Sequence, residues 1–127
     1  MIKAVLFDID GVLLRSEDVL AKIFADAVED AGYPRPSRET VLEFNGLPAF
    51  RWLQKLIPNA PADSLRKAAE LLPNAYRARI SKKDIMPGAC ETLSELTKRG
   101  ITAGIVTNQT RDTAFKNAGV VGISRNA

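Results

Sequence analysis

The sequence has no histidine and only one cysteine among its 127 residues. Without histidine, catalysis by a serine or cysteine paired with an imidazole is excluded, and so are zinc sites built on imidazole. A single cysteine forms neither an internal disulfide nor a cysteine-rich metal site. No apolar run approaches the roughly 18 residues of a membrane span, and the first one ends at Asp8, unlike a signal peptide. We therefore expect a cytoplasmic protein without a membrane partner.

The chain also lacks a strong excess of charge of one sign. It has 18 basic and 15 acidic residues, and the basic residues are spread over several segments. Proteins that bind nucleic acids gather their basic side chains on one face, often together with aromatic ones. We therefore expect no nucleic-acid partner. The length and the hydrophobic fraction of 46% fit one small domain that carries an insertion.

An apolar run near the N-terminus ends in two carboxylates. Residues 2–7 are apolar except for Lys3, which predicts a strand buried on both faces, and Asp8, Asp10 and Gly11 follow directly. Burying an unpaired carboxylate is costly, so a buried strand has no structural use for these groups. In open α/β sheets, the carboxyl ends of parallel strands carry the ligand site. The alternative is a plain polar turn with Asp-Gly as its turn residues.

Two more apolar runs predict strands, and helical patterns separate them. Residues 101–106 predict the second strand, which ends in Thr107, Asn108 and Gln109, and residues 120–123 predict a third. Residues 15–82 show helical spacing interrupted by proline and glycine, and Pro73 is expected to kink or split a helix over 62–80. Further helices are expected after Pro87-Gly88 and over 112–117. The pattern predicts an α/β fold, with a parallel sheet of about three strands and a helical insertion.

The residues at the two strand ends suit phosphoryl transfer. One carboxylate of an Asp-x-Asp pair can attack phosphorus, and the other can exchange a proton with the leaving and entering oxygens. Asp8 and Asp10 together also offer hard oxygen ligands to Mg²⁺. Gly11 lets the backbone come close to a phosphate, and the Thr107 hydroxyl can donate to its oxygens.

Three segments resemble the haloacid dehalogenase-like hydrolase superfamily. Residues 7–13, which read FDIDGVL, resemble its first motif, and residues 105–108, which read IVTN, resemble its second. Residues 87–100 resemble the helix that precedes the second motif in its phosphatases. Residues 15–82 resemble the helical cap of the phosphoglycolate phosphatase and β-phosphoglucomutase branch.

This resemblance implies a Rossmann-like core, residues 1–14 and 83–127, with a cap, residues 15–82, inserted after the first strand. It implies that Asp8 is the nucleophile, that Asp10 is the general acid and base and lends its carbonyl to Mg²⁺, and that both bind the metal. Thr107, Asn108 and Gly11 would bind the phosphoryl group. The implied function is a magnesium-dependent phosphatase or phosphotransferase that forms an aspartyl-phosphate and acts on a small phosphorylated metabolite.

The sequence departs from the family pattern in two places. Arg15 stands where the branch usually has an acidic residue. The family also has a lysine in a third motif and an acidic pair in a fourth. Only 18 residues follow Gln109 in this sequence. Among them, Asp112 and Lys116 are the candidates to replace these groups.

The chain therefore looks shortened at its C-terminus, and the alternative function is a catalytically weak or inactive relative that binds phosphate or a protein. A thin sheet would also leave an edge that a homodimer could cover. The substrate, and the choice between phosphatase and mutase, stay open.

Overall fold

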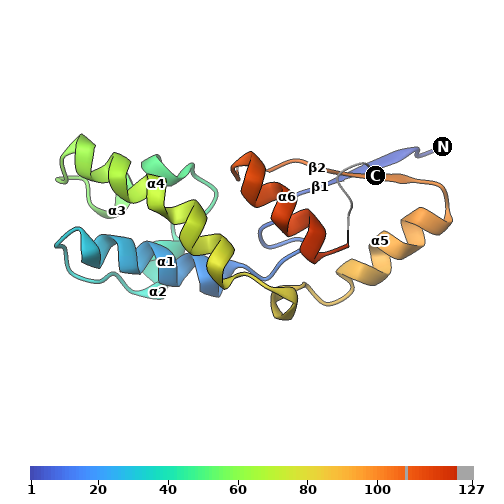
Figure 1. Cartoon of the computed structure of the whole chain (residues 1–127), viewed down its shortest axis with the longest axis horizontal. Coiled ribbons are helices and arrows are strands. Elements are labelled where there is room, and N and C mark those ends of the chain that lie inside the picture. Colours follow the sequence, from blue (N-terminus) through green and yellow to red (C-terminus); the bar gives the residue numbers. More distant parts are fainter. Residues whose placement is uncertain (108, 123–127) are drawn as a thin grey trace. The chain divides into compact units, whose positions relative to one another are not determined.

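The computed structural model describes residues 1–107 and 109–122, and the chain divides into two compact units. One unit combines Met1–Ser16 with Ile80–Ala127 and holds both strands, and the other is the all-helical Glu17–Arg79 (Figure 1). The fold class predicted from the sequence, α/β with a parallel sheet, is confirmed. That the helical unit acts as a cap stays a prediction.

The sheet of the α/β unit contains two strands in the described part of the chain. Strand β1 (Ala4–Phe7) pairs in parallel with β2 (Thr102–Ile105), in a register that sets Ala4 opposite Thr102 and Phe7 opposite Ile105. The connection between them contains the whole helical unit, the short 3₁₀ helix η1 (Lys82–Asp84) and helix α5 (Ala89–Lys98), which packs against β2. Helix α6 (Arg111–Val120) follows β2 (Figure 1).

Two expectations about the strands are wrong. The strands are not buried on both faces: Leu6 in β1 is 69% exposed and Val106, just after β2, is 60% exposed. A third strand does not begin at Val120, because this residue ends α6, and Val121 and Gly122 form the turn that follows. Ile123, the last residue of that expected strand, lies outside the described residues. Helix α6 itself is longer than the predicted segment 112–117 because Thr110 caps its start, where the Thr110 hydroxyl accepts from the Thr113 amide.

The helical unit contains four helices that begin and end close to the sequence signals. They are α1 (Glu17–Asp30), α2 (Arg38–Leu42), α3 (Ala49–Leu56) and α4 (Ala62–Arg79). The Ser37 hydroxyl caps α2 by accepting from the Thr40 amide at 3.2 Å. Helix α4 continues through Pro73 without a break, so the expected split does not occur. Proline removes one backbone hydrogen bond, which a helix of 18 residues packed against α1 and α3 tolerates.

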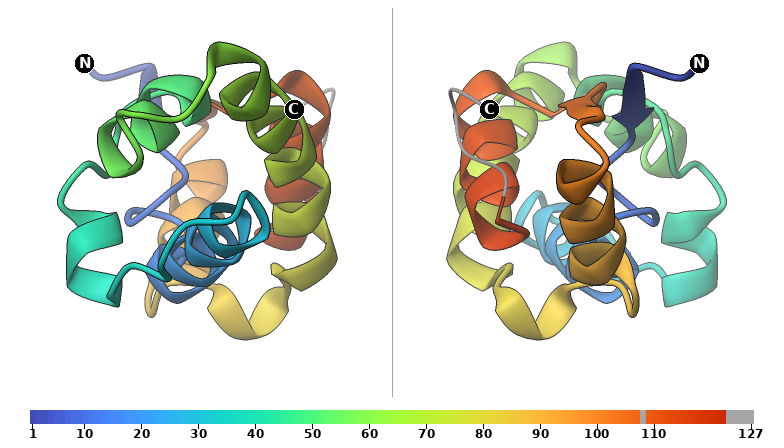
Figure 2. Two further views of the ribbon diagram at one scale, coloured as in Figure 1. Left: turned by 90° about the vertical axis from the view of Figure 1, so that its left-hand side faces the viewer. Right: turned by 90° about the vertical axis from the view of Figure 1, so that its right-hand side faces the viewer.

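The core of this unit forms where α1 meets the other three helices (Figure 2). The rings of Phe24 on α1 and Trp52 on α3 stack with centroids 4.0 Å apart. The Trp52 indole N–H donates to the backbone carbonyl of Val41 at 2.7 Å, which links α3 to α2. Stacked aromatic rings with a satisfied indole N–H are a common way to close a small apolar core.

Candidate functional site

The site begins at the carboxyl ends of the two paired strands. Phe7 lies opposite Ile105, and the Val106 amide donates to the Phe7 carbonyl at 2.9 Å. Asp8 follows β1 directly, and Thr107 follows β2 after one further residue. Parallel pairing therefore brings the first carboxylate and the predicted phosphate-binding hydroxyl to the same edge of the sheet, as expected from the sequence.

A tight turn after β1 shapes the predicted motif. The Ile9 carbonyl accepts the amides of Leu13 at 2.9 Å and Leu14 at 3.0 Å, and the Gly11 amide donates to the Leu14 carbonyl at 2.8 Å. Gly11 has a φ of +78°, which side chains disfavour, so glycine is required here. Its own N–H is used inside the turn. The contribution of Gly11 to phosphate binding, which stays a prediction, would therefore be room for the ligand rather than its own amide.

The turn is held in place by the segment that enters α5. The Met86 amide donates to the Leu13 carbonyl at 2.8 Å, and the Arg15 amide donates to the Asp84 carbonyl at 2.6 Å. Ile9, Leu13 and Leu14 are almost completely buried, so apolar packing fixes the backbone on which the two carboxylates stand. The Arg15 side chain, at the position that departs from the family pattern, is exposed.

The two carboxylates have different surroundings. Asp8 is exposed, and its Oδ1 accepts the Ile9 amide at 2.8 Å. Asp10 is half-buried, and both of its oxygens accept hydrogen bonds: Oδ1 from the Ser16 hydroxyl at 2.7 Å and Oδ2 from the Gln109 side-chain amide at 2.9 Å. The exposed carboxylate is open to a ligand, whereas the other is held by the protein. This difference suits one reacting group and one proton-transferring group.

Sequence reasoning missed the residues that hold Asp10. Ser16 lies in the segment 15–82 that is predicted only as a helical insertion, and Gln109 is predicted only as part of the polar cluster after the second strand. Gln109 in turn accepts from the Asn117 side chain on α6 at 2.9 Å, and its backbone amide donates to the Thr107 hydroxyl at 3.1 Å. The burial of Asn117 accounts for this contact, because buried polar groups need partners, but the burial is visible only in the folded structure.

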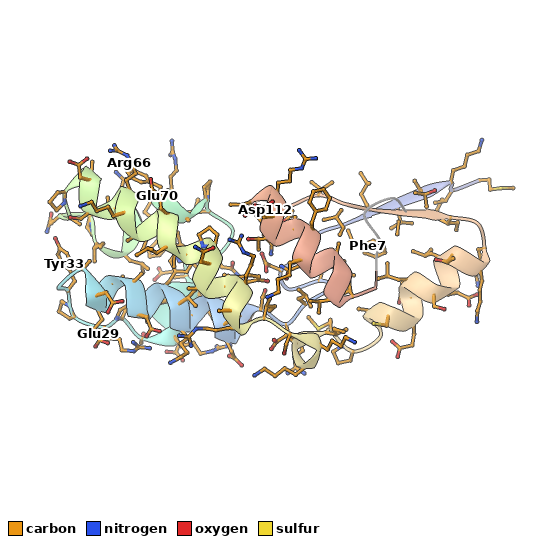
Figure 3. All side chains as sticks on the ribbon, viewed as in Figure 1. Phe7, Glu29, Tyr33, Arg66, Glu70 and Asp112 are labelled. Atoms are coloured by element: carbon orange, nitrogen blue, oxygen red, sulfur yellow. The ribbon has the colours of Figure 1, made fainter. Side chains whose placement is uncertain are left out.

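The remaining predicted residues lie elsewhere or outside the described part. Asn108 lies outside the described residues. Asp112 is exposed in the first turn of α6, and Lys116 is exposed one turn later on the same helix (Figure 3). Within residues 1–107 and 109–122, no three or more histidine, cysteine, aspartate or glutamate side chains gather into a group that could hold a metal ion. Asp112 therefore does not join Asp8 and Asp10 in a three-carboxylate group.

Comparison with known proteins identifies the family of this chain. The profile of the haloacid dehalogenase-like hydrolase family matches residues 5–125. A phosphoglycolate phosphatase from Vibrio parahaemolyticus is 33% identical over 116 residues, which are 85% of this chain and 51% of the relative. A pyrophosphatase PpaX from Oceanobacillus iheyensis is 29% identical over 124 residues, 98% of this chain and 56% of the relative.

A solved structure gives the same result for the fold. A β-phosphoglucomutase from Clostridium difficile superposes with a TM-score of 0.78 at 20% identity, covering 98% of this chain and 59% of the mutase. This chain thus spans little more than half the length of the proteins it matches. In the described part, no helix is long and apolar enough to cross a membrane. The chain belongs to the haloacid dehalogenase-like hydrolase family.

Proposed function

We propose that this chain is a magnesium-dependent phosphatase or phosphotransferase that acts on a small phosphorylated metabolite through an aspartyl-phosphate. The observation that carries the proposal is the different environment of the two carboxylates after β1, with Asp8 exposed and Asp10 held by two side chains. Thr107 follows the neighbouring strand end. The names of the relatives, phosphoglycolate phosphatase and pyrophosphatase, support a phosphorylated substrate.

The proposed reaction has two steps that regenerate both aspartates. First, a carboxylate oxygen of Asp8 attacks phosphorus, the bond from phosphorus to the leaving oxygen breaks, and Asp10 gives its proton to that oxygen. Then water attacks the phosphorus of the aspartyl-phosphate, the bond to Asp8 breaks, and Asp10 takes the proton of the water. One water is consumed, and phosphate and the alcohol are released. In a phosphotransferase, a second hydroxyl takes the place of the water.

The chemistry of the donor set fits magnesium. Mg²⁺ commonly binds only one or two carboxylates and completes its octahedron with waters and phosphate oxygens, so the absence of a three-carboxylate group in the described residues does not exclude it. Asp8 would hold the ion through its exposed carboxylate. Asp10 would hold it through its main-chain carbonyl, because both of its carboxylate oxygens accept other hydrogen bonds. When bound, the ion supplies positive charge that offsets the charge of the phosphoryl group.

Thr107 would donate its hydroxyl to an oxygen of the transferring phosphoryl group, with Asn108 beside it in the sequence. Hydrogen-bond donors placed in advance at such oxygens stabilise the transition state. The helical unit Glu17–Arg79 would act as the cap that excludes water and selects the substrate, because it is inserted between the two strands whose ends form the site.

The proposal is tested by hydrolysis of p-nitrophenyl phosphate by the purified chain with and without MgCl₂. We expect slow, metal-dependent release of phosphate, because no third carboxylate joins Asp8 and Asp10 in the described residues and losing one preorganised partner lowers the rate by roughly 10²–10³-fold. Asp8→Asn should abolish the release. Asp10→Asn should lower its steady-state rate by about 10²–10⁴-fold, because the second step still needs Asp10 to take the proton of the water, even though p-nitrophenolate leaves with little need of protonation. Asp30→Asn, at the exposed end of α1, is the matched control. Full activity of Asp8→Asn would show that the nucleophile is assigned wrongly.

A second candidate function is binding of phosphate or of a protein without turnover. The observation that favours it is the absence of a third metal-binding side chain near the pair in the described residues. Calorimetry with inorganic phosphate and MgCl₂ distinguishes the two candidates. Tight binding with no turnover of any aryl phosphate supports the second, and turnover that a chelator abolishes supports the first.

A further inference from the structure

The Asp10 carboxylate is held from both sides by neutral hydrogen-bond donors. Ser16, six residues further along the chain, donates to Oδ1 at 2.7 Å, and Gln109, after the neighbouring strand, donates to Oδ2 at 2.9 Å. Ser16 is completely buried, and Gln109 is half-buried. Two donors that approach different oxygens fix the direction of the carboxylate plane and not only its distance from the backbone.

Gln109 is itself oriented by a side chain from the C-terminal half of α6. Its Oε1 accepts the Asn117 side-chain N–H at 2.9 Å, and Asn117 is 0% exposed. A glutamine amide has one accepting end and one donating end, so a donor at Oε1 directs the N–H₂ end to the other side, toward Asp10. The backbone amide of Gln109 is tied to the Thr107 hydroxyl at 3.1 Å. The order of donation is therefore Asn117 to Gln109 to Asp10.

We infer that Gln109 is a positioning residue for the general acid Asp10, because it holds one carboxylate oxygen in a fixed direction while Ser16 holds the other. This inference rests on the proposed function. The Gln109 N–H₂ group donates to Oδ2 and the Ser16 hydroxyl donates to Oδ1, so the carboxylate cannot rotate without losing one of these hydrogen bonds. Removing the Gln109 donor would leave the carboxylate fixed from one side alone.

The consequence for the reaction depends on the leaving group. Proton donation to the leaving oxygen matters greatly for an alkyl phosphate, whose alkoxide is a poor leaving group, and little for p-nitrophenyl phosphate. A group that positions Asp10 therefore affects the two substrates differently. A residue that only stabilises the fold would affect both to the same degree.

The test measures kcat/KM for p-nitrophenyl phosphate and for glycerol phosphate, both with MgCl₂, in the parent chain and in Gln109→Met. Methionine has nearly the same length but no donor. We expect kcat/KM for glycerol phosphate to fall by about 10–10²-fold, a much larger loss than for the aryl phosphate. In an Asp10→Asn background the substitution at Gln109 should have no further effect, because its action passes through Asp10.

Gln54→Met, at an exposed position of α3, is the matched control, and Gln109→Ala is a second variant that cannot overpack the site. Circular dichroism checks that each variant folds. Equal losses on the two substrates, no loss, or a loss that persists in the Asp10→Asn background overturn the inference and leave the proposed function standing. If the parent chain hydrolyses neither substrate, the proposed function is overturned and the positioning role with it.

Discussion

The two compact units bury their apolar side chains to very different degrees. In the helical unit, Val28, Val41 and Leu53 are almost completely buried around the stacked pair of Phe24 and Trp52. In the α/β unit, no residue of either strand is buried: β1 alternates between exposed and half-buried residues, β2 is half-buried after an exposed Thr102, and Leu6 is 69% exposed. Apolar residues on a strand gain stability only when another layer covers them. The helical unit therefore has a core of its own, whereas the described sheet does not.

The best-buried part of the α/β unit is the turn that carries the site. Ile9, Leu13 and Leu14 are almost completely buried, and so are the polar side chains of Ser16 and Asn117. The residues that position the carboxylates are therefore better packed than the strands that lead to them. This difference explains how a sheet of two described strands still presents an ordered arrangement of Asp8, Asp10 and Thr107.

A matched pair of leucine substitutions tests the comparison most directly. Leu53→Ala, at a 0% exposed position in the helical unit, should lower the free energy of unfolding by about 2–5 kcal/mol. Leu6→Ala, at the exposed position on β1, should change it by less than about 0.5 kcal/mol. Urea unfolding followed by circular dichroism measures both. The fluorescence of Trp52, the chain's only tryptophan, reports on the helical unit separately.

Similar losses in the two variants would contradict the comparison. In particular, a large loss in Leu6→Ala would mean that another surface covers this face of β1 in solution. Sedimentation at several concentrations would then test the homodimer that a thin sheet predicts. This association would appear as a mass that rises with concentration in the parent chain and not in Leu6→Ala.

A smaller effect is expected from Trp52→Phe, which separates the two interactions of the indole. The phenyl ring keeps an aromatic partner for Phe24, whereas the donor to the Val41 carbonyl and part of the buried ring volume are lost. That carbonyl retains the Phe44 amide at 3.4 Å, so it is not left without a partner. We expect a loss of about 2 kcal/mol, of which roughly 1 kcal/mol is the net value of one hydrogen bond and the rest is the lost burial of ring atoms. A loss as large as that of Leu53→Ala would show instead that the shape of the indole fills the core.

The sequence predicts the elements better than their burial. Ser37 and the proline and glycine breaks act locally, so the helices begin and end close to the expected residues. The burial of a strand depends on layers contributed by other parts of a protein, which is why the exposure of Leu6 could not be foreseen from the apolar pattern of residues 2–7. The prediction of a third strand from Val120 was wrong for a related reason. Val120 is the last residue of α6, a helix that begins at the cap residue Thr110.

The sequence predicts the residues of the candidate site that belong to one short motif. It does not predict the contacts between residues that are distant in the sequence. Asp8 and Asp10 stand out because carboxylates directly follow an apolar run. Gln109 reaches Asp10 across 99 positions of the sequence, and Asn117 reaches Gln109 from inside a helix. A hydrogen bond between such distant residues leaves no periodic or spaced pattern, so only the folded structure reveals it.

The smallest expected effect concerns an ion pair of the helical unit and its dependence on pH. Asp26 on α1 accepts a hydrogen bond from Arg35 at 2.6 Å, close to the end of the helix where Figure 3 labels Glu29 and Tyr33. This hydrogen bond, opposed by some desolvation and helped by nearby positive charges, lowers the pKa of Asp26 below its ordinary value of 3.8. A lowered pKa in the folded state adds stability above the unfolded pKa, and this stability is lost as the pH falls through the folded value.

Arg35→Met should therefore lower the thermal midpoint slightly at pH 6, and the difference from the parent chain should shrink when both are measured below pH 3.8. The effect is small because both side chains are partly exposed and water screens the pair. Arg66→Met removes a more exposed arginine from the pair with Asp63 on α4 and corrects for the lost charge. If the difference in thermal midpoint between Arg35→Met and the parent chain stays constant down to pH 2, Arg35 stabilises the unit by packing rather than through the ionised Asp26. The acid sensitivity of the helical unit would then lie in other carboxylates.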